Sequence, residues 1–317
     1  MDAGVYEKKG YLRQRFRIFH LQDRAMKPVA FHYHDFHKII LFLDGEASYI
    51  IEGKTYPLKA RDILFVSAGE IHRPVTTPGK SYERIVIYVS PDFLSDLGQS
   101  RYDLASCFAM ARQSSSVMHA PPGKSHDLLF HMNKLEQVAH QDGYANELYT
   151  EILFAEFMIL LNRSLMDNEL QELQSVTYDS KIQELLVYIN EHLTEELSVD
   201  KLAEAGALSR YYLMHKFKAM TGYSIHQYVT SKRLMLAKSL LASTDDPIAD
   251  VAFQCGFNDY SSFSREFKKA FSLTPKGYRK GLSYPCKNKM NAIYYKQRKA
   301  HCNNQLPLLK RVRKQPN

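Results

Sequence analysis

The chain has 317 residues, of which 45% are hydrophobic and 24% charged, so it is long enough for about two domains with apolar cores. No apolar run approaches the ~18 residues of a membrane-spanning helix, the N-terminal residues lack the apolar core of a signal peptide, and none of the four cysteines forms a Cys-x-x-Cys pair. These features argue against a membrane protein, a disulfide framework and a zinc cluster, and we expect a cytoplasmic protein.

The positive charge is concentrated at the C-terminal end. The formal net charge is +8, but residues 267–317 contain 14 Lys and Arg and no Asp or Glu, so 8 minus 14 leaves −6 for the residues before them. A basic end on an otherwise acidic chain indicates an anionic partner, with nucleic acid first. A tail that only improves solubility is the other interpretation.

Residues from about 28 to 90 predict antiparallel β structure. The runs KIILFL, EASYIIE, DILFV and YERIVIYV are rich in β-branched and aromatic residues, and turn pairs such as Asp44-Gly45, Gly53-Lys54 and Pro78-Gly79 separate them. This spacing favours hairpins in a sandwich or barrel. Residues from about 100 to 122 contain Ser, Gly and Pro and predict a passage rich in loops.

Two helices are predicted between about 125 and 170, followed by a polar linker at 171–180. Apolar residues recur at helical spacing in both segments, at Leu128, Leu129, Met132 and Leu135 and then at Leu148, Ile152, Ala155 and Ile159.

An internal repeat occupies residues 181–280. Val199, Leu202 and Ala203 recur 49 positions later, and Leu213, Phe217 and Tyr228 recur 50 positions later. Each copy predicts a helix, a turn and a second helix, and a longer helix from about 225 to 242 joins the copies. Ser198 is the expected cap of the first short helix, and Gly206 and Gly256 mark the two turns.

The second helix of each copy has one apolar face and one free face. We expect the first to run from about Ser209 to Met220 and the second to begin near Asp259. Such helices fit the major groove of DNA, although two helix pairs in a plain bundle would give the same pattern. The predicted DNA-binding residues are Arg210, Tyr211, Met214, His215 and Lys218 in the first copy, and Tyr260, Ser261, Ser264, Arg265, Lys268 and Lys269 in the second.

Residues 181–280 resemble the AraC/XylS family of bacterial regulators. The resemblance rests on LSVDKLAEAGALSRYYLMHKFKAMTGYSIHQYV, RLMLAKSLL and IADVAFQCGFNDYSSFSREFKKAFSLTPKGYR. It implies base-reading positions at Tyr211, Met214 and His215 and at Tyr260, Ser261 and Arg265. Met214 and His215 stand where the family often has Arg or other polar readers, so the target sequence of a relative cannot be transferred.

Four histidines form the second conspicuous group: His32, His34, His37 and His72. Imidazole is a common ligand of transition metals, and a His-x-His pair on a strand places both rings on one face. The segment also resembles a cupin, because His32, His34 and Gly45 match its first motif and Gly69 with His72 part of the second. In AraC-type regulators, the resemblance implies a domain that binds a small effector, often a sugar.

The cupin pattern is incomplete in this chain. Lys38 occupies the position at which metal-binding cupins carry a Glu ligand, and Arg61, Ser67 and Thr76 replace a usual Gly, Pro and Asn. A protonated amine cannot donate to a metal ion. We therefore expect no metal, no cofactor and no enzyme activity. The predicted effector-binding residues are His32, His34, His37, Lys38 and His72.

The sequence thus predicts a two-domain α+β transcription regulator. A cupin-like antiparallel β domain at 1–122 precedes dimerisation helices at 123–170, the linker, an all-α DNA-binding domain with two helix-turn-helix units at 181–284, and a basic tail at 285–317. The expected partners are double-stranded promoter DNA, a small effector, RNA polymerase and a second copy of the chain. A metal-dependent cupin enzyme with a helical appendage is the first alternative, and a β domain that serves only dimerisation is another.

Overall fold

The computed structural model describes residues 12, 15–24, 26–99, 101–123, 126–176 and 179–281. They fall into two compact units. One takes in the described residues up to Glu184 together with Tyr211–Ser224, and the other takes in Leu185–Arg210 and the described residues from Ile225 onward. The predicted basic tail at 285–317 lies outside the described residues.

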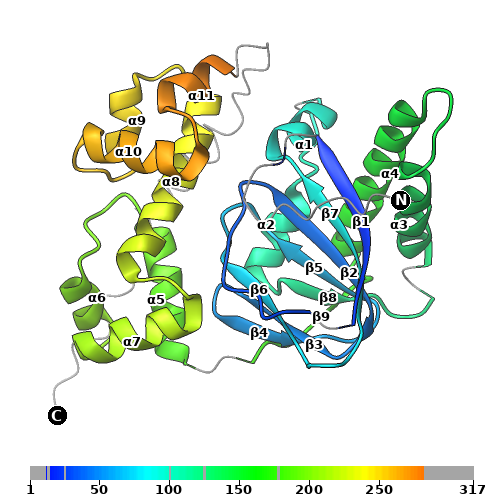
Figure 1. Cartoon of the computed structure of the whole chain (residues 1–317), viewed down its shortest axis with the longest axis horizontal. Coiled ribbons are helices and arrows are strands. Elements are labelled where there is room, and N and C mark those ends of the chain that lie inside the picture. Colours follow the sequence, from blue (N-terminus) through cyan, green and yellow to red (C-terminus); the bar gives the residue numbers. More distant parts are fainter. Residues whose placement is uncertain are drawn as a thin grey trace. The chain divides into compact units, whose positions relative to one another are not determined.

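Two antiparallel sheets form the centre of the first unit (Figure 1). The larger sheet has the order β1 (Phe16–Asp23), β7 (Tyr82–Val89), β2 (His37–Gly45), β5 (Asp62–Val66), β8 (Val117–His119) and β9 (Gln171–Glu172). The smaller sheet has the order β4 (Lys54–Pro57), β3 (Ala47–Ile51) and β6 (His72–Thr76). The predicted antiparallel β domain is confirmed.

Strand β2 lies between two layers of core, because alternate residues of a strand point to opposite faces. Ile39 and Leu41 belong to the apolar cluster shared with the helices, whereas Ile40 and Phe42 belong to the cluster that includes Tyr49 of β3. Lys38 is in register with Tyr88 of β7 and Val66 of β5. A lysine is therefore built into the buried part of β2.

Glycine fixes the connection between β2 and β3, which belong to different sheets. Gly45 has a φ of +122°, and a Cβ at this position would lie 1.8 Å from the carbonyl oxygen of Ser81. Only glycine fits this conformation and this close approach. The chain therefore changes direction at Asp44-Gly45 as predicted, but the strands that it joins do not form the expected hairpin, because β2 pairs with β5 and β7.

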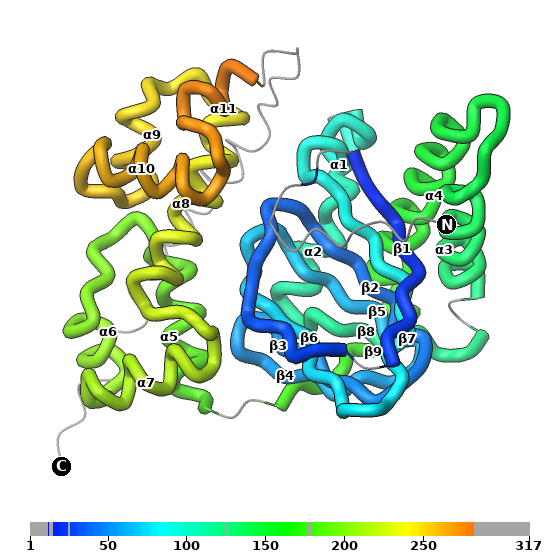
Figure 2. The backbone as a smooth tube through the Cα atoms, in the orientation of Figure 1, coloured from blue at the N-terminus to red at the C-terminus, as the bar shows by residue number. Residues whose placement is uncertain are grey.

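Helices cover the outer face of the larger sheet. They are α1 (Pro91–Leu97), α2 (Ser106–Gln113), α3 (His126–Ala139) and α4 (Asn146–Met166), and Figure 2 shows α3 and α4 side by side. The helices predicted between 125 and 170 are confirmed. The prediction of a loop-rich passage at 100–122 is wrong in part, because Cys107, Phe108 and Ala111 of α2 are buried in the core.

The segment predicted as a polar linker also contributes to this unit. Gln171 and Glu172 form β9, which pairs with β8, and Val176 bridges to Thr55. Polar composition did not reveal this, because an edge strand needs backbone partners more than apolar side chains.

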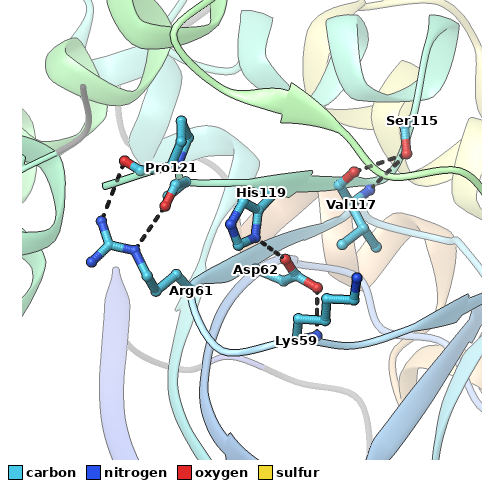
Figure 3. Close-up of polar contacts among 8 residues, drawn as sticks. Lys59, Arg61, Asp62, Ser115, Val117, His119 and Pro121 are labelled. Carbon is cyan, nitrogen blue, oxygen red and sulfur yellow. Dashed lines mark hydrogen bonds and ion pairs between the residues drawn. The ribbon is translucent and has the colours of Figure 1, made fainter. Parts of the chain in front are cut away.

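A polar group fixes β5 against β8 (Figure 3). The Nδ1 atom of His119 lies 2.7 Å from Oδ1 of the fully buried Asp62, and the Lys59 N–H donates to Oδ2 at 2.7 Å. Arg61 donates from Nε to the carbonyl oxygen of Ala120 at 2.8 Å. Burial raises the pKa of Asp62, whereas its hydrogen bonds with the Lys59 N–H and with His119 lower it.

From Ser180 to Gly281 the described chain is helical apart from short connections, as predicted. The helices are α5 (Ser180–Glu191), α6 (Val199–Ala205), α7 (Arg210–Thr221), α8 (Ile225–Ser243), α9 (Ile248–Gln254), α10 (Tyr260–Phe271) and α11 (Pro275–Gly281).

Candidate functional site

Helix α10 has the form expected of a DNA-reading helix. Asp259 caps it by accepting a hydrogen bond from the Ser262 N–H at 2.7 Å. Three phenylalanines at positions 263, 267 and 271 are buried and anchor one face. On the other side Tyr260, Ser261, Arg265, Lys268 and Lys269 are exposed, and Ser264 is half-buried.

The turn before α10 requires glycine. Gly256 has a φ of +85°, and a Cβ there would lie 2.8 Å from the Leu193 carbonyl oxygen and 3.0 Å from the Arg233 guanidinium. Arg233 donates to the carbonyl oxygens of Leu193 and Glu195 at 2.8 and 2.6 Å. Only glycine leaves room for this arginine to hold the preceding loop. The predicted role of Gly256 in the turn is confirmed.

Helix α6 begins at the predicted cap, because the Ser198 hydroxyl accepts from the Lys201 N–H at 3.3 Å. The turn after α6 differs in detail from the expectation. Gly206 is right-handed, with a φ of −84°, and Ala207 takes the left-handed conformation with a φ of +48°. A Cβ on Gly206 would lie 2.9 Å from a methyl group of Leu185. Gly206 therefore serves close packing, and its neighbour makes the turn.

Helix α7 buries Leu213, Phe217 and Thr221 on one side. Arg210 is exposed, and its Nε lies 3.0 Å from a carboxylate oxygen of the equally exposed Asp200. An exposed pair of this kind is weak, so Arg210 can exchange it for a phosphate. The remaining predicted readers on this helix, Tyr211, Met214, His215 and Lys218, are all exposed.

Inside the β domain, three of the four predicted histidines form a cluster. One ring nitrogen each from His32, His34 and His72 lies within 4.8 Å of the other two. Nδ1 of His72 is 2.8 Å from the Glu70 carbonyl oxygen, and Nδ1 of His32 is 2.8 Å from that of Ala30. A carbonyl only accepts, so both Nδ1 atoms carry the proton and both Nε2 atoms present a lone pair.

Two histidines of the cluster, His34 and His72, are neutral at physiological pH. Burial, followed by the charge of Lys38 and the ring of His32, lowers the pKa of His34 to about 2. Burial and the same neighbouring charges also hold the pKa of His72 well below its ordinary value. Neutral imidazoles offer acceptor nitrogens to a ligand instead of positive charge.

Lys38 reaches this cluster from β2. Its Nζ donates to Nε2 of His72 at 3.2 Å and to the Tyr49 hydroxyl at 3.4 Å, and it lies 5.4 Å from the ring centre of Tyr88. Burial, together with the nearby positive charge of Arg84, lowers the pKa of Lys38 to about 7. The side chain therefore exchanges between ammonium and amine near neutral pH.

The position of Lys38 bears on whether the cluster suits a resident metal ion. Three imidazole nitrogens are a suitable donor set for a transition metal. The Nζ atom of Lys38 lies 3.2 Å from one of them; in its ammonium form it has no lone pair to donate and repels a divalent cation, and in neither form does Lys38 supply the carboxylate ligand of a cupin. The residues present therefore do not fit the metal site of a cupin, and we derive no chemistry from such an ion.

His37 does not join the cluster, contrary to the sequence prediction. His37 and Lys38 are adjacent in β2, so their side chains point to opposite faces of the sheet. The ring of His37 stacks on Phe108 with centres 4.2 Å apart, and its Nδ1 accepts from the Ala68 N–H at 3.2 Å. Burial, with a contribution from Arg112, lowers its pKa to about 3. His37 is part of the core between sheet and helices.

The sequence prediction of effector-binding residues omitted several residues that line the cavity beside Lys38. Strand β7 reads Tyr82, Glu83, Arg84, Ile85, Val86, Ile87 and Tyr88. The alternation of period two was a usable signal, because every second residue of a strand faces the same side. Those that line the cavity with Lys38 and Tyr49 are Tyr82, Arg84, Val86 and Tyr88.

Comparison with known proteins identifies both parts of the chain. Residues 18–158 match the model of the AraC-like ligand binding domain, and residues 202–281 match a helix-turn-helix domain. The HTH-type transcriptional activator RhaS of Enterobacter sp. (strain 638) is 28% identical over 258 residues, which cover 79% of this chain and 87% of the relative. The chain belongs to the AraC family of transcriptional regulators.

Two further similarities are to a second RhaS protein and to a solved structure. RhaS of Shigella sonnei (strain Ss046) is 27% identical over 257 residues, covering 79% of this chain and 87% of the relative. The crystal structure of apo ToxT from Vibrio cholerae aligns with 87% of this chain and 100% of its own, with 16% identity and a TM-score of 0.37. As a member of the AraC family, the chain is a DNA-binding transcription regulator with a ligand-binding domain.

Among the described residues, no helix combines the length and the apolar character needed to cross a membrane.

Proposed function

We propose that this AraC-family protein is a homodimeric, effector-controlled regulator that reads promoter DNA with α7 and α10 and contacts RNA polymerase. The observation that carries the proposal is the form of these two helices. Each buries an apolar side and exposes its predicted readers, and α10 is held at its start by the cap of Asp259. A helix anchored on one side and polar on the other suits the major groove.

The readers divide by chemistry into base contacts and phosphate contacts. Arg265 lies in the middle of α10, where its guanidinium can pair with the two acceptors of a guanine edge. Lys268 and Lys269 lie in the last turns, where phosphates are the better partners. On α7, the exposed rings of Tyr211 and His215 stack with centres 6.1 Å apart and offer both apolar and polar contacts.

We propose that α8 sets the distance between the two DNA-reading helices. Its 19 residues correspond to about 28 Å at ~1.5 Å per residue. Successive major grooves on one face of DNA lie about 34 Å apart. A spacer of this length supports binding of the two helices of one chain in neighbouring grooves.

The homodimer is proposed from an apolar stripe on α4. Leu148, Ile152 and Ile159 are 59%, 55% and 42% exposed, and they recur at spacings of four and seven residues. This is the spacing of the seam between two paired helices. A second copy of the chain, with the same stripe, is the occupant that we propose.

Control by a small molecule, such as a sugar or sugar-like compound, is assigned to the β domain, because residues 18–158 match a ligand-binding domain. The relatives named RhaS are transcriptional activators. We extend activation, and with it a contact to RNA polymerase in the cytoplasm, to this chain as part of the proposal. No reaction is assigned to the histidine cluster, because Lys38 stands against the metal that a cupin enzyme would use.

Selection of genomic DNA fragments by the purified full-length protein tests the proposal. We expect enrichment of a motif with two blocks of preferred bases about one helical turn apart. A variant with Tyr211 and Arg265 both changed to alanine should lose the motif and retain weak binding. Recovery of random fragments by the unaltered protein would refute sequence-specific regulation.

A further inference from the structure

The interior of the β domain contains a lysine, Lys38, whose ammonium form has no carboxylate partner among the described residues. Lys38 is only 3% exposed. The other buried cation of the cavity, Arg84, is paired with Asp23. An isolated buried charge is costly, so a site that keeps one is suited to a ligand that supplies the opposite charge.

His34 provides a second, independent indication of a ligand. It is 4% exposed, and neither of its ring nitrogens has a hydrogen-bond partner within the described part of the chain. Its ring centre is 5.2 Å from that of His72, which in turn contacts Lys38. Buried polar groups in native proteins are normally satisfied, so an orphaned imidazole beside an unpaired ammonium marks a place where polar atoms of a ligand belong.

The chemistry of the two groups defines the ligand. The Lys38 ammonium donates hydrogen bonds and favours an anion, and one positive charge matches one carboxylate. Neutral imidazoles accept through a ring nitrogen, and a hydroxyl group is the donor that fits them. The rings of Tyr49 and Tyr88 line a cavity together with Lys38 and can cover the C–H side of a small carbon skeleton.

We infer that the effector is a small monocarboxylate that carries hydroxyl groups, such as an aldonate or a uronate. Its carboxylate replaces His72 as the partner of Lys38, and its hydroxyl groups donate to the unprotonated ring nitrogen of His34 and to Nε2 of His72. The inference rests on the proposed function of the β domain as an effector site. It differs from the expectation of a neutral sugar, for which the buried charge of Lys38 would remain unmatched.

Paired ligands test the inference on the full-length protein. Aldonates and uronates are each compared with the neutral aldose of the same stereochemistry by calorimetry and by the shift in melting temperature. At least one acid should bind and stabilise the protein, and its parent aldose should bind at least tenfold more weakly. ZnCl2 and NiCl2 alone are measured in the same way and should not bind stoichiometrically.

Variants connect the affinity to Lys38. Lys38→Met keeps the length of the side chain and removes the charge, and it should weaken the acid about 10- to 100-fold, as expected for a lost hydrogen bond to a charged group. Lys80→Met removes an exposed lysine and should leave the affinity unchanged. His34→Phe should also weaken the acid while the fold, followed by circular dichroism, persists.

The outcomes separate this inference from the proposed function. Equal binding of acids and parent aldoses, binding of a metal ion in place of the acids, full affinity in Lys38→Met, or no binding by any acid would each overturn the inference. Operator binding is measured on the same preparations, both without added ligand and with each of the acids. Its presence leaves the regulator proposal standing when the acids fail, and its absence refutes that proposal by itself.

Discussion

At the scale of single residues, Arg265 and Lys268 allow base reading to be separated from phosphate contact. Both side chains are exposed on α10, on the side away from Phe263 and Phe267. Two hydrogen bonds from a guanidinium to guanine discriminate by about 1–3 kcal/mol. Arg265→Ala should therefore weaken binding mainly to the preferred operator and relax the preference at one or two base pairs.

The matched change is Lys268→Ala. A lost phosphate contact should weaken all sequences by similar factors and reduce the slope of log affinity against log salt by about one. Affinities for the operator and for single-base variants at two salt concentrations distinguish the two effects. A uniform loss for every sequence in Arg265→Ala would make Arg265 a phosphate contact instead.

Arg61 shows what a single departure from a family pattern can mean. It stands where cupins usually have glycine, and its φ of +78° is a conformation that favours glycine. The strain is offset by the hydrogen bonds of its guanidinium to the carbonyl oxygens of Ala120 and Pro121 at 2.8 and 3.4 Å. The sequence identified the unusual residue, but its partners lie about sixty positions away and could not be predicted.

At the scale of elements, the strands around the histidines should make the β domain sensitive to acid. The pKa values of His34 and His37 are lowered to about 2 and about 3, so the folded state stays unprotonated while the unfolded chain binds protons below about pH 6.5. The contribution of these two histidines to stability is complete above pH 6.5, and it falls as the pH drops toward 3, by about 1.4 kcal/mol per pH unit for each histidine.

Lys38 makes stability depend on pH over a second, more alkaline range, and in that range stability again rises with pH. Its folded pKa of about 7 lies below the ordinary 10.5, so the unfolded chain binds the additional proton between these values and stability should rise with pH across them. The charged or titratable groups that face Lys38 are Arg84 and Tyr88 of β7, Tyr49 of β3, His72 of β6 and His34.

Urea unfolding followed by circular dichroism from pH 4 to 10 measures both windows. Lys38→Met should flatten the alkaline window, and His37→Phe should reduce the slope of the acid window by about one proton. Replacement of the exposed His140 by Gln serves as the control. Unchanged slopes in both core variants would contradict the burial argument.

Helix α4 carries the prediction of dimerisation. The residues of the exposed stripe already recur at helical spacing in the sequence. That pattern suggests a buried face, but in the structure the buried face of α4 is formed by other residues, among them Leu153, Phe154 and Phe157. Ile152→Glu places a charge in the middle of the stripe and should convert the dimer into a monomer, because an unpaired buried charge costs more than a seam of this size provides. Sedimentation equilibrium measures the result.

The control places the same charge elsewhere. Tyr102 is 66% exposed and lies outside α3 and α4, so Tyr102→Glu should leave the association state unchanged. If Ile152→Glu sediments like the unaltered protein, the stripe is not the dimer seam.

The elements also show which parts of the fold could be predicted. The caps Ser198 and Asp259 and the turn at Gly256 are local devices, so the sequence located the helices near them. The pairing of β9 with β8 and the burial of α2 depend on segments distant in the chain. Strand alternation could have shown that His37 lies on the opposite side of β2 from Lys38. The sequence prediction instead grouped the four histidines by residue type, and it therefore placed His37 in the wrong cluster.

At the scale of the whole molecule, the uneven charge determines how the protein finds DNA. The net charge is +8, and residues 282–317 contain nine Lys and Arg and no Asp or Glu. Each phosphate that a protein neutralises adds about 0.9 to the slope of log affinity against log salt. We expect steep salt dependence for the full chain, with a large share from these C-terminal residues.

Truncation after Gly281 tests this division of charge. The shortened chain retains α10 and the exposed Lys268 and Lys269. Its affinity for random DNA should fall strongly and its salt slope should decrease by several units, because several phosphate contacts are lost together. The preference for the operator over single-base variants should persist, since phosphate contacts carry no sequence information. A truncated chain with an unchanged salt slope would show that these residues only aid solubility, whereas loss of the base preference would mean that they help to read the operator.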